Sequence, residues 1–176
     1  MKGTILYATR YGSTLEVCQW IRQGMTRHEA SVCPVSKWRE DEAEFFVLGS
    51  PIFVGKPHPD MINFLNAAGN RLRGRPAAVF ITSWAESTPY RSSCQDFLDL
   101  MRYYLAPCVP FAEASLPGRL LMEEISPRDR RTMQRLLRRI DHLSPDFHSE
   151  SIAWQDVRSA QRCREFGRRV DRLLGG

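Results

Sequence analysis

Three short and uninterrupted apolar runs constrain the fold more than any other feature of the sequence. They cover residues 4–8, 45–49 and 77–82. Their apolar residues are continuous rather than alternating, which is typical of strands that are buried on both faces of a parallel sheet. Two weaker runs, at residues 31–35 and 109–114, each contain a proline, and proline in a strand favours the edge of a sheet. The sequence therefore predicts a layered sheet.

Helical patterns lie between these runs. Apolar residues recur at intervals of three and four within residues 15–25, 61–68 and 97–105. Alternation of strands and helices predicts an α/β fold with right-handed crossovers.

The last third of the chain departs from this simple alternation. The segment Ser126-Pro127-Arg128-Asp129 has the features of a helix start, and an apolar face continues from it to Leu143. Residues 144–151 are expected to form a loop. A final amphipathic helix is expected from Trp154 to Leu173. The prediction is a single domain over residues 1–176 with an extra basic helical segment near residues 118–150.

Composition excludes several classes of protein. The length of 176 residues suits one domain, and no apolar run approaches the ~20 residues of a membrane helix. The first residues lack the pattern of a secretory signal. The five cysteines include no CxxC pair and the four histidines do not pair with them, so we expect reduced thiols, a cytoplasmic location and no metal site.

Arginine dominates the positive charge. The chain carries 25 Lys and Arg against 20 Asp and Glu, and residues 118–176 contain 13 Arg but only nine acidic residues. Arginine favours bidentate contact with carboxylate or phosphate groups, or attraction to an anionic membrane. A solvated face without a partner is the simpler interpretation. No motif for nucleic-acid recognition accompanies the charge, so we expect no nucleic-acid partner.

Three loops follow the three apolar runs, at positions where parallel strands end. The first loop, residues 9–14, contains hydroxyl groups and a glycine before a helix, and Ser13 and Glu16 have the spacing of a capping box. Such a segment can bind an anion, although it is also compatible with an ordinary turn. It has neither the lysine of a Walker loop nor the G-x-G-x-x-G dinucleotide pattern.

The second and third loops carry apolar and aromatic residues. The second loop, residues 49–59, contains Ile52 and Phe53, and the third loop, residues 82–87, contains Trp84. Loops at the carboxyl ends of parallel strands converge on one crevice. Together the three loops predict a site for a ligand with a phosphate group and a flat ring.

The sequence resembles the flavodoxins, whose phosphate loop T-x-[TS]-G-x-T is similar to residues 9–14, with Tyr11 as a departure. It resembles one branch more closely, the menaquinone-dependent protoporphyrinogen oxidases. The segments that carry this likeness are residues 5–14, 49–56 and 154–157. The resemblance implies a flavodoxin-like, doubly wound, five-stranded parallel sheet of order 2-1-3-4-5.

The same resemblance implies FMN as the cofactor and assigns residues to it. The residues implied to bind FMN are Thr9, Arg10, Tyr11, Gly12, Ser13, Thr14, Pro51, Ile52, Phe53, Val54, Gly55, Ser83 and Trp84. No side chain is expected to act as a general base, and the resemblance places Gly55 and Lys56 near the flavin N5. A lysine there would favour the anionic reduced flavin.

Three functions remain open at this point. The first is an oxidoreductase that takes hydride from a porphyrinogen and passes electrons to a quinone, with Arg131, Arg135, Arg138 and Arg139 contacting substrate or the inner face of a membrane. The second is a non-catalytic FMN electron carrier that docks an acidic redox protein through the same arginines. The third is a flavodoxin fold that serves only as a binding scaffold.

Overall fold

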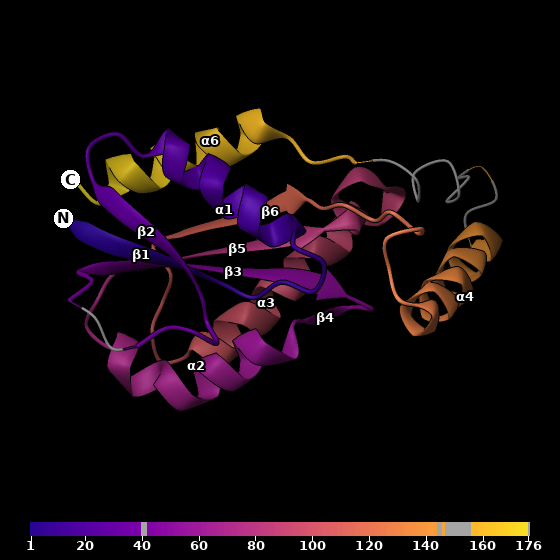
Figure 1. Cartoon of the computed structure of the whole chain (residues 1–176), viewed down its shortest axis with the longest axis horizontal. Helices are drawn as coiled ribbons and strands as arrows, with labels where there is room; N and C mark the ends of the chain where they lie inside the picture. The colour runs from indigo at the N-terminus through magenta and orange to yellow at the C-terminus, as the bar shows by residue number, and fades with distance from the viewer. Residues whose placement is uncertain (40–41, 144–145, 147–155, 176) are drawn as a thin grey trace.

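A parallel sheet forms the centre of the molecule (Figure 1). The computed structural model describes residues 1–39, 42–143, 146 and 156–175. The sheet has the order β2-β1-β3-β5-β6, and the short β4 pairs antiparallel with β3. The strands are β1 (Lys2–Tyr7), β2 (Glu29–Pro34), β3 (Phe45–Phe53), β4 (Lys56–Pro57), β5 (Ala77–Ser83) and β6 (Ala112–Pro117). The expected order 2-1-3-4-5 is therefore confirmed for the five parallel strands, and β4 only shifts the numbering.

Helices cover both faces of the sheet (Figure 1). On one face lie α1 (Ser13–Gly24) and α6 (Ala160–Leu173). On the other lie α2 (Pro59–Leu72) and α3 (Ser93–Leu105). Each face has its own apolar core, because the central strands are apolar on both sides: Phe46 and Leu48 pack toward α2 and α3, and Phe45 and Val47 toward α1 and α6. This arrangement explains why the apolar runs are continuous.

Helix α4 (Pro127–Leu143) lies beyond the carboxyl ends of the strands and away from both layers (Figure 1). Its start is the one expected from the sequence, since the Ser126 hydroxyl accepts a hydrogen bond from the Asp129 N–H at 3.1 Å. Among the described helices none is long and apolar enough to cross a membrane.

Two expected elements begin later than the sequence suggested. The last strand starts at Ala112 rather than 109, because Pro110 has no N–H and pairing starts only where the Phe111 N–H donates to Ala77 O at 2.9 Å. The last helix starts at Ala160, after an N-cap at Ser159. Trp154 and most of the expected loop at residues 144–151 lie outside the described residues.

Candidate functional site

The three loops meet at one edge of the sheet and line a cavity of about 400 Å³. The predicted site residues that line it are Arg10, Tyr11, Ser13, Pro51, Ile52, Phe53, Val54, Gly55, Ser83 and Trp84. Thr9, Gly12 and Thr14 belong to the same first loop but do not line the cavity. The edge of a doubly wound sheet where the strand order reverses is where such folds bind ligands.

The first loop ends in a helix start with unused hydrogen-bonding capacity. Gly12 is the N-cap of α1 with φ of 81°, a left-handed conformation that suits glycine, and no side chain caps the helix. The expected capping box is therefore wrong: Ser13 is already the first helical residue. The buried hydroxyls of Thr9 and Thr14 have no hydrogen-bond partner among the described residues. Free N–H groups and orphaned hydroxyls at a helix N-terminus fit a phosphate group.

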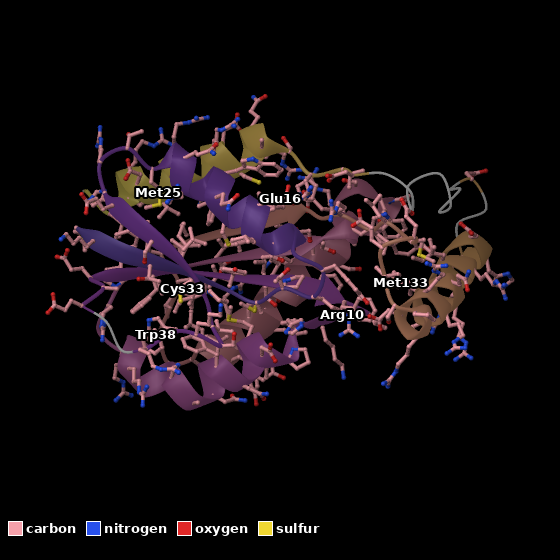
Figure 2. All side chains as sticks on the ribbon, viewed as in Figure 1. Arg10, Glu16, Met25, Cys33, Trp38 and Met133 are labelled. Atoms are coloured by element: carbon pink, nitrogen blue, oxygen red, sulfur yellow. The ribbon has the colours of Figure 1, made fainter. Side chains whose placement is uncertain are left out.

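Arg10 and Tyr11 direct their side chains toward α4. The guanidinium of Arg10 donates to both carboxylate oxygens of Asp129, at 2.6 and 2.8 Å, and the Tyr11 hydroxyl donates to the same carboxylate. The Arg10 guanidinium holds the pKa of Asp129 below its ordinary value. Figure 2 shows Arg10 at the edge of the sheet that faces α4, on which Met133 lies. Asp129 is thus a residue of the site, whereas the sequence analysis identified it only as an acidic residue in the first turn of a helix.

The second loop is a tight hairpin between β3 and β4. Its two central residues, Val54 and Gly55, have φ of 50° and 76°, the positive values of a type I′ turn. Gly55 adopts this conformation freely, whereas a β-branched valine does so only with strain. Lys56, the first residue of β4, is exposed and is not among the residues that line the cavity. Its predicted place near N5 stays a prediction.

Replacing Val54 with asparagine is expected to raise the free energy of unfolding by about 1 kcal/mol, because asparagine tolerates positive φ and Asn-Gly is the preferred type I′ pair. Chemical unfolding of the ligand-free protein measures the change. Val54→Ala is the matched control, since alanine also disfavours positive φ and should recover little of this energy. An unchanged or lower stability of Val54→Asn would contradict the strained turn.

The third loop begins a short helical turn at the end of β5. The Ser83 hydroxyl accepts a hydrogen bond from the Ala85 N–H at 3.1 Å, which starts η1 (Trp84–Ser87). Trp84 lines the cavity and packs against the apolar cluster beneath α4. Gly118 crosses close by, where a Cβ atom would lie 3.0 Å from the Ser83 carbonyl carbon. The third loop therefore packs directly against the start of the segment that leads from β6 to α4.

The far wall of the cavity is apolar and comes from the extra segment. We call it the α4 roof; it consists of Leu120, Leu121, Ile125, Met133, Leu136, Ile140 and Leu143. The amphipathic pattern of residues 133–143 was visible in the sequence, but not that its apolar face would cover the three loops. The expected contact arginines, Arg131, Arg135, Arg138 and Arg139, are exposed on α4, and Arg139 also lines the cavity.

The cysteines do not supply a nucleophile to the cavity. All five are free thiols, and none lines this cavity. Cys18 and Cys163 are fully buried between α1 and α6, and burial raises the pKa of Cys163 to about 11. Thiols with raised pKa values are poor nucleophiles. None of the five cysteines is therefore placed to react with a molecule bound in this cavity.

Solved structures with the same fold are flavodoxins and flavodoxin-like proteins. Two-electron reduced Megasphaera elsdenii flavodoxin is similar over 98% of this chain and 99% of its own, with a TM-score of 0.58 and 12% identity. A WrbA-like protein from Agrobacterium tumefaciens gives a TM-score of 0.57 and 15% identity over 99% and 97% of the two chains. Fusobacterium nucleatum flavodoxin, described as bound to flavin mononucleotide, gives a TM-score of 0.51 and 13% identity over 65% of this chain and 70% of its own.

No curated protein matches the sequence. The family model for the flavodoxin domain matches residues 4–145, which include nearly all of the sheet, the three loops and α4. Flavodoxins bind FMN, and the orphaned hydroxyls of the first loop fit its phosphate group. This chain belongs to the flavodoxin domain family.

Proposed function

We propose that this protein is an FMN-dependent oxidoreductase of the protoporphyrinogen oxidase type. The observation that carries the proposal is the continuity of the cavity from the three loops to the α4 roof. The three loops suit the phosphate and the ring of a flavin, whereas the roof adds apolar surface beside them. A cofactor that only relayed electrons through an exposed edge would have no need for an apolar wall opposite that edge.

The first loop would hold the phosphate of FMN without a free cation. The hydroxyls of Thr9 and Thr14 and the N–H groups at the start of α1 are available, whereas the Arg10 guanidinium is already paired with Asp129. Backbone N–H groups at a helix N-terminus suffice to bind a phosphate. The second loop and Trp84 would flank the ring.

FMN, when bound, supplies a two-electron acceptor that can take hydride from a porphyrinogen methylene bridge and pass the electrons to a quinone. The role of the chain is position and exclusion of water. Leu136 and Ile140 of the α4 roof would contact an apolar substrate, and Arg139 at the cavity would meet a carboxylate on its periphery. The exposed arginines of α4 would let the protein rest on the anionic inner face of a membrane.

The test combines an assay of FMN binding and substrate turnover with a substitution that adds bulk to the cavity. Purified protein with FMN should show flavin absorption that persists through gel filtration, and should oxidise protoporphyrinogen with a quinone acceptor. Ile140→Trp adds bulk beneath the roof, so turnover should fall about tenfold while FMN remains bound. Leu173→Trp, at a half-exposed position of α6, is the matched control and should retain full turnover.

Three outcomes would contradict the proposal. A holoprotein that never oxidises protoporphyrinogen would exclude this compound as the substrate. A protein that never retains FMN would exclude the flavin as the cofactor as well. Equal losses in Ile140→Trp and Leu173→Trp would show that the cavity does not receive the substrate.

An FMN electron carrier is the second candidate. The observation that favours it is the face formed by Arg131, Arg135 and Arg138, which are exposed and have no ion pair within the described part of the chain. Such a face would attract an acidic redox protein at low ionic strength. Electron transfer to that partner that vanishes at high salt, without turnover of porphyrinogen, would favour this candidate over the enzyme.

A further inference from the structure

Asp129 connects two parts of the site that lie far apart in the sequence. Its side chain is 5% exposed and receives the bidentate guanidinium of Arg10 and the hydroxyl of Tyr11. The Tyr11 hydroxyl in turn accepts the Ser126 N–H at 3.1 Å. Both ends of this cluster belong to functional elements, the first loop on one side and the N-terminus of α4 on the other. The cluster therefore fastens α4 to the first loop.

The same carboxylate sets the charge beside the first loop. Arg10 lies within that loop, and its guanidinium also stacks on the Phe53 ring, 4.5 Å from the ring centroid. With Asp129 ionised, the pair is neutral. Two further arginines are paired with acids as well: Arg158 pairs with Glu16 and Asp156, and Arg119 with Glu124.

We propose that Asp129 is a specificity-determining residue that lowers the affinity of the first loop for phosphate groups and, in exchange, holds α4 closed over the cavity. The proposal rests on the proposed binding of FMN. The direction of the change in ligand affinity distinguishes this role from a merely structural one: removal of the carboxylate should strengthen the binding of a phosphate-bearing ligand. A residue that only stabilised the site would weaken all ligands when replaced.

The expected change in affinity for a phosphate group follows from the charges. Replacement of Asp129 leaves the Arg10 guanidinium uncompensated within the loop that would surround a dianionic phosphate. One additional unit charge a few ångströms from a dianion, in partly solvated surroundings, changes its affinity roughly tenfold. Riboflavin lacks the phosphate and should not gain from this charge. The ratio of FMN to riboflavin affinity thus isolates the electrostatic effect from any change in packing.

The experiment measures FMN and riboflavin dissociation constants in four proteins. Asp129→Asn should raise the FMN-to-riboflavin affinity ratio roughly tenfold, and Arg10→Gln should lower it roughly tenfold because Asp129 then stands alone. The double variant should return near the wild-type ratio. Asp99→Asn, which removes an exposed carboxylate on α3, is the control for net charge and should change nothing.

Hydrogen exchange supplies the second readout. Amides of α4 should exchange faster in Asp129→Asn than in the wild type, while those of α2 stay unchanged, because the cluster that joins α4 to the first loop is broken. Unchanged exchange in α4 would overturn the fastening role. A fall of FMN and riboflavin affinity by the same factor in Asp129→Asn would overturn the specificity role.

Inorganic phosphate separates this proposal from the proposed function. It should raise the melting temperature of Asp129→Asn more than that of the wild type. If no variant binds either flavin but phosphate shows this difference, the proposed function fails while the role of Asp129 is supported. If phosphate stabilises both proteins equally, or neither, the role of Asp129 fails.

Discussion

Replacing Gly167 with alanine is expected to destabilise the protein by about 2 kcal/mol, because α1 and α6 touch through their backbones at this position. A Cβ atom on Gly167 would lie 2.1 Å from the Ile21 carbonyl oxygen, and one on Gly24 would lie 2.2 Å from the Arg164 carbonyl oxygen. No flexible side chain can move aside, so the two helices must separate.

Two opposing effects decide the sign of this change. Alanine is the better helix former by about 1 kcal/mol. Overpacking in a well-packed core costs up to about 3 kcal/mol, and contact with backbone belongs at the upper end of that range. The clash therefore exceeds the gain in helix propensity, and the net loss is about 2 kcal/mol.

Chemical unfolding of the ligand-free protein measures this loss. Arg168→Ala changes the next residue of α6, which is exposed, and should alter the stability by less than about 0.5 kcal/mol. If Gly167→Ala matched this control or increased the stability, α1 and α6 would not be in the close contact described here.

The sheet could be predicted because its cause is local. Burial on both faces requires continuous apolar residues, so β3 and β5 stood out from the sequence. The strand ends could not be predicted, because pairing continues wherever the neighbouring backbone allows it. Lys2 is exposed, yet it extends β1 because it lies opposite Glu29 in the ladder with β2. Backbone hydrogen bonds do not require an apolar side chain.

The start of the last helix shows a limit of pattern analysis. Val157 fits the periodicity of α6, yet it lies before the first residue of the helix, because Asp156 forms a β-bridge with Arg119. Arg158 then turns back to donate to Ser13 O at 3.3 Å and to pair with Glu16. Contacts with residues this distant in the sequence override periodicity and leave no local trace.

The candidate site was predictable in place but not in detail. Parallel topology brings the ends of β1, β3 and β5 together, so three loops with suitable residues predict a common crevice. The pairing of Arg10 with Asp129 joins residues 119 positions apart. A helix-start acid has the same local sequence whether or not it also binds an arginine, so this pair required the structure.

The hydroxyl of Thr14 gives the sharpest test of the first loop, since its removal should have opposite effects on stability and on FMN binding. Thr14 is fully buried and its hydroxyl has no hydrogen-bond partner among the described residues. A buried polar group without a partner costs about 1–3 kcal/mol. Thr14→Val keeps the shape and removes the hydroxyl, so the ligand-free protein should gain about 1 kcal/mol of stability.

FMN binding should change in the other direction. A hydrogen bond to a charged phosphate contributes about 1.5–3 kcal/mol. Its loss in Thr14→Val should weaken FMN about 30-fold, which corresponds to about 2 kcal/mol. Riboflavin, which has no phosphate, should bind the variant and the wild type equally. Fluorescence quenching titrations with the two flavins, together with chemical unfolding, measure all three quantities.

Thr4 of β1 is the matched control, because it is also buried but its hydroxyl is 3.1 Å from that of Ser31. Thr4→Val removes a satisfied hydroxyl, so it should lower the stability by about 1 kcal/mol and leave FMN affinity unchanged. If Thr14→Val behaved like Thr4→Val, its hydroxyl would have a structural partner rather than a ligand. If it weakened FMN and riboflavin by the same factor, the Thr14 hydroxyl would not contact the phosphate, because the loss of a hydrogen bond to that group weakens FMN alone.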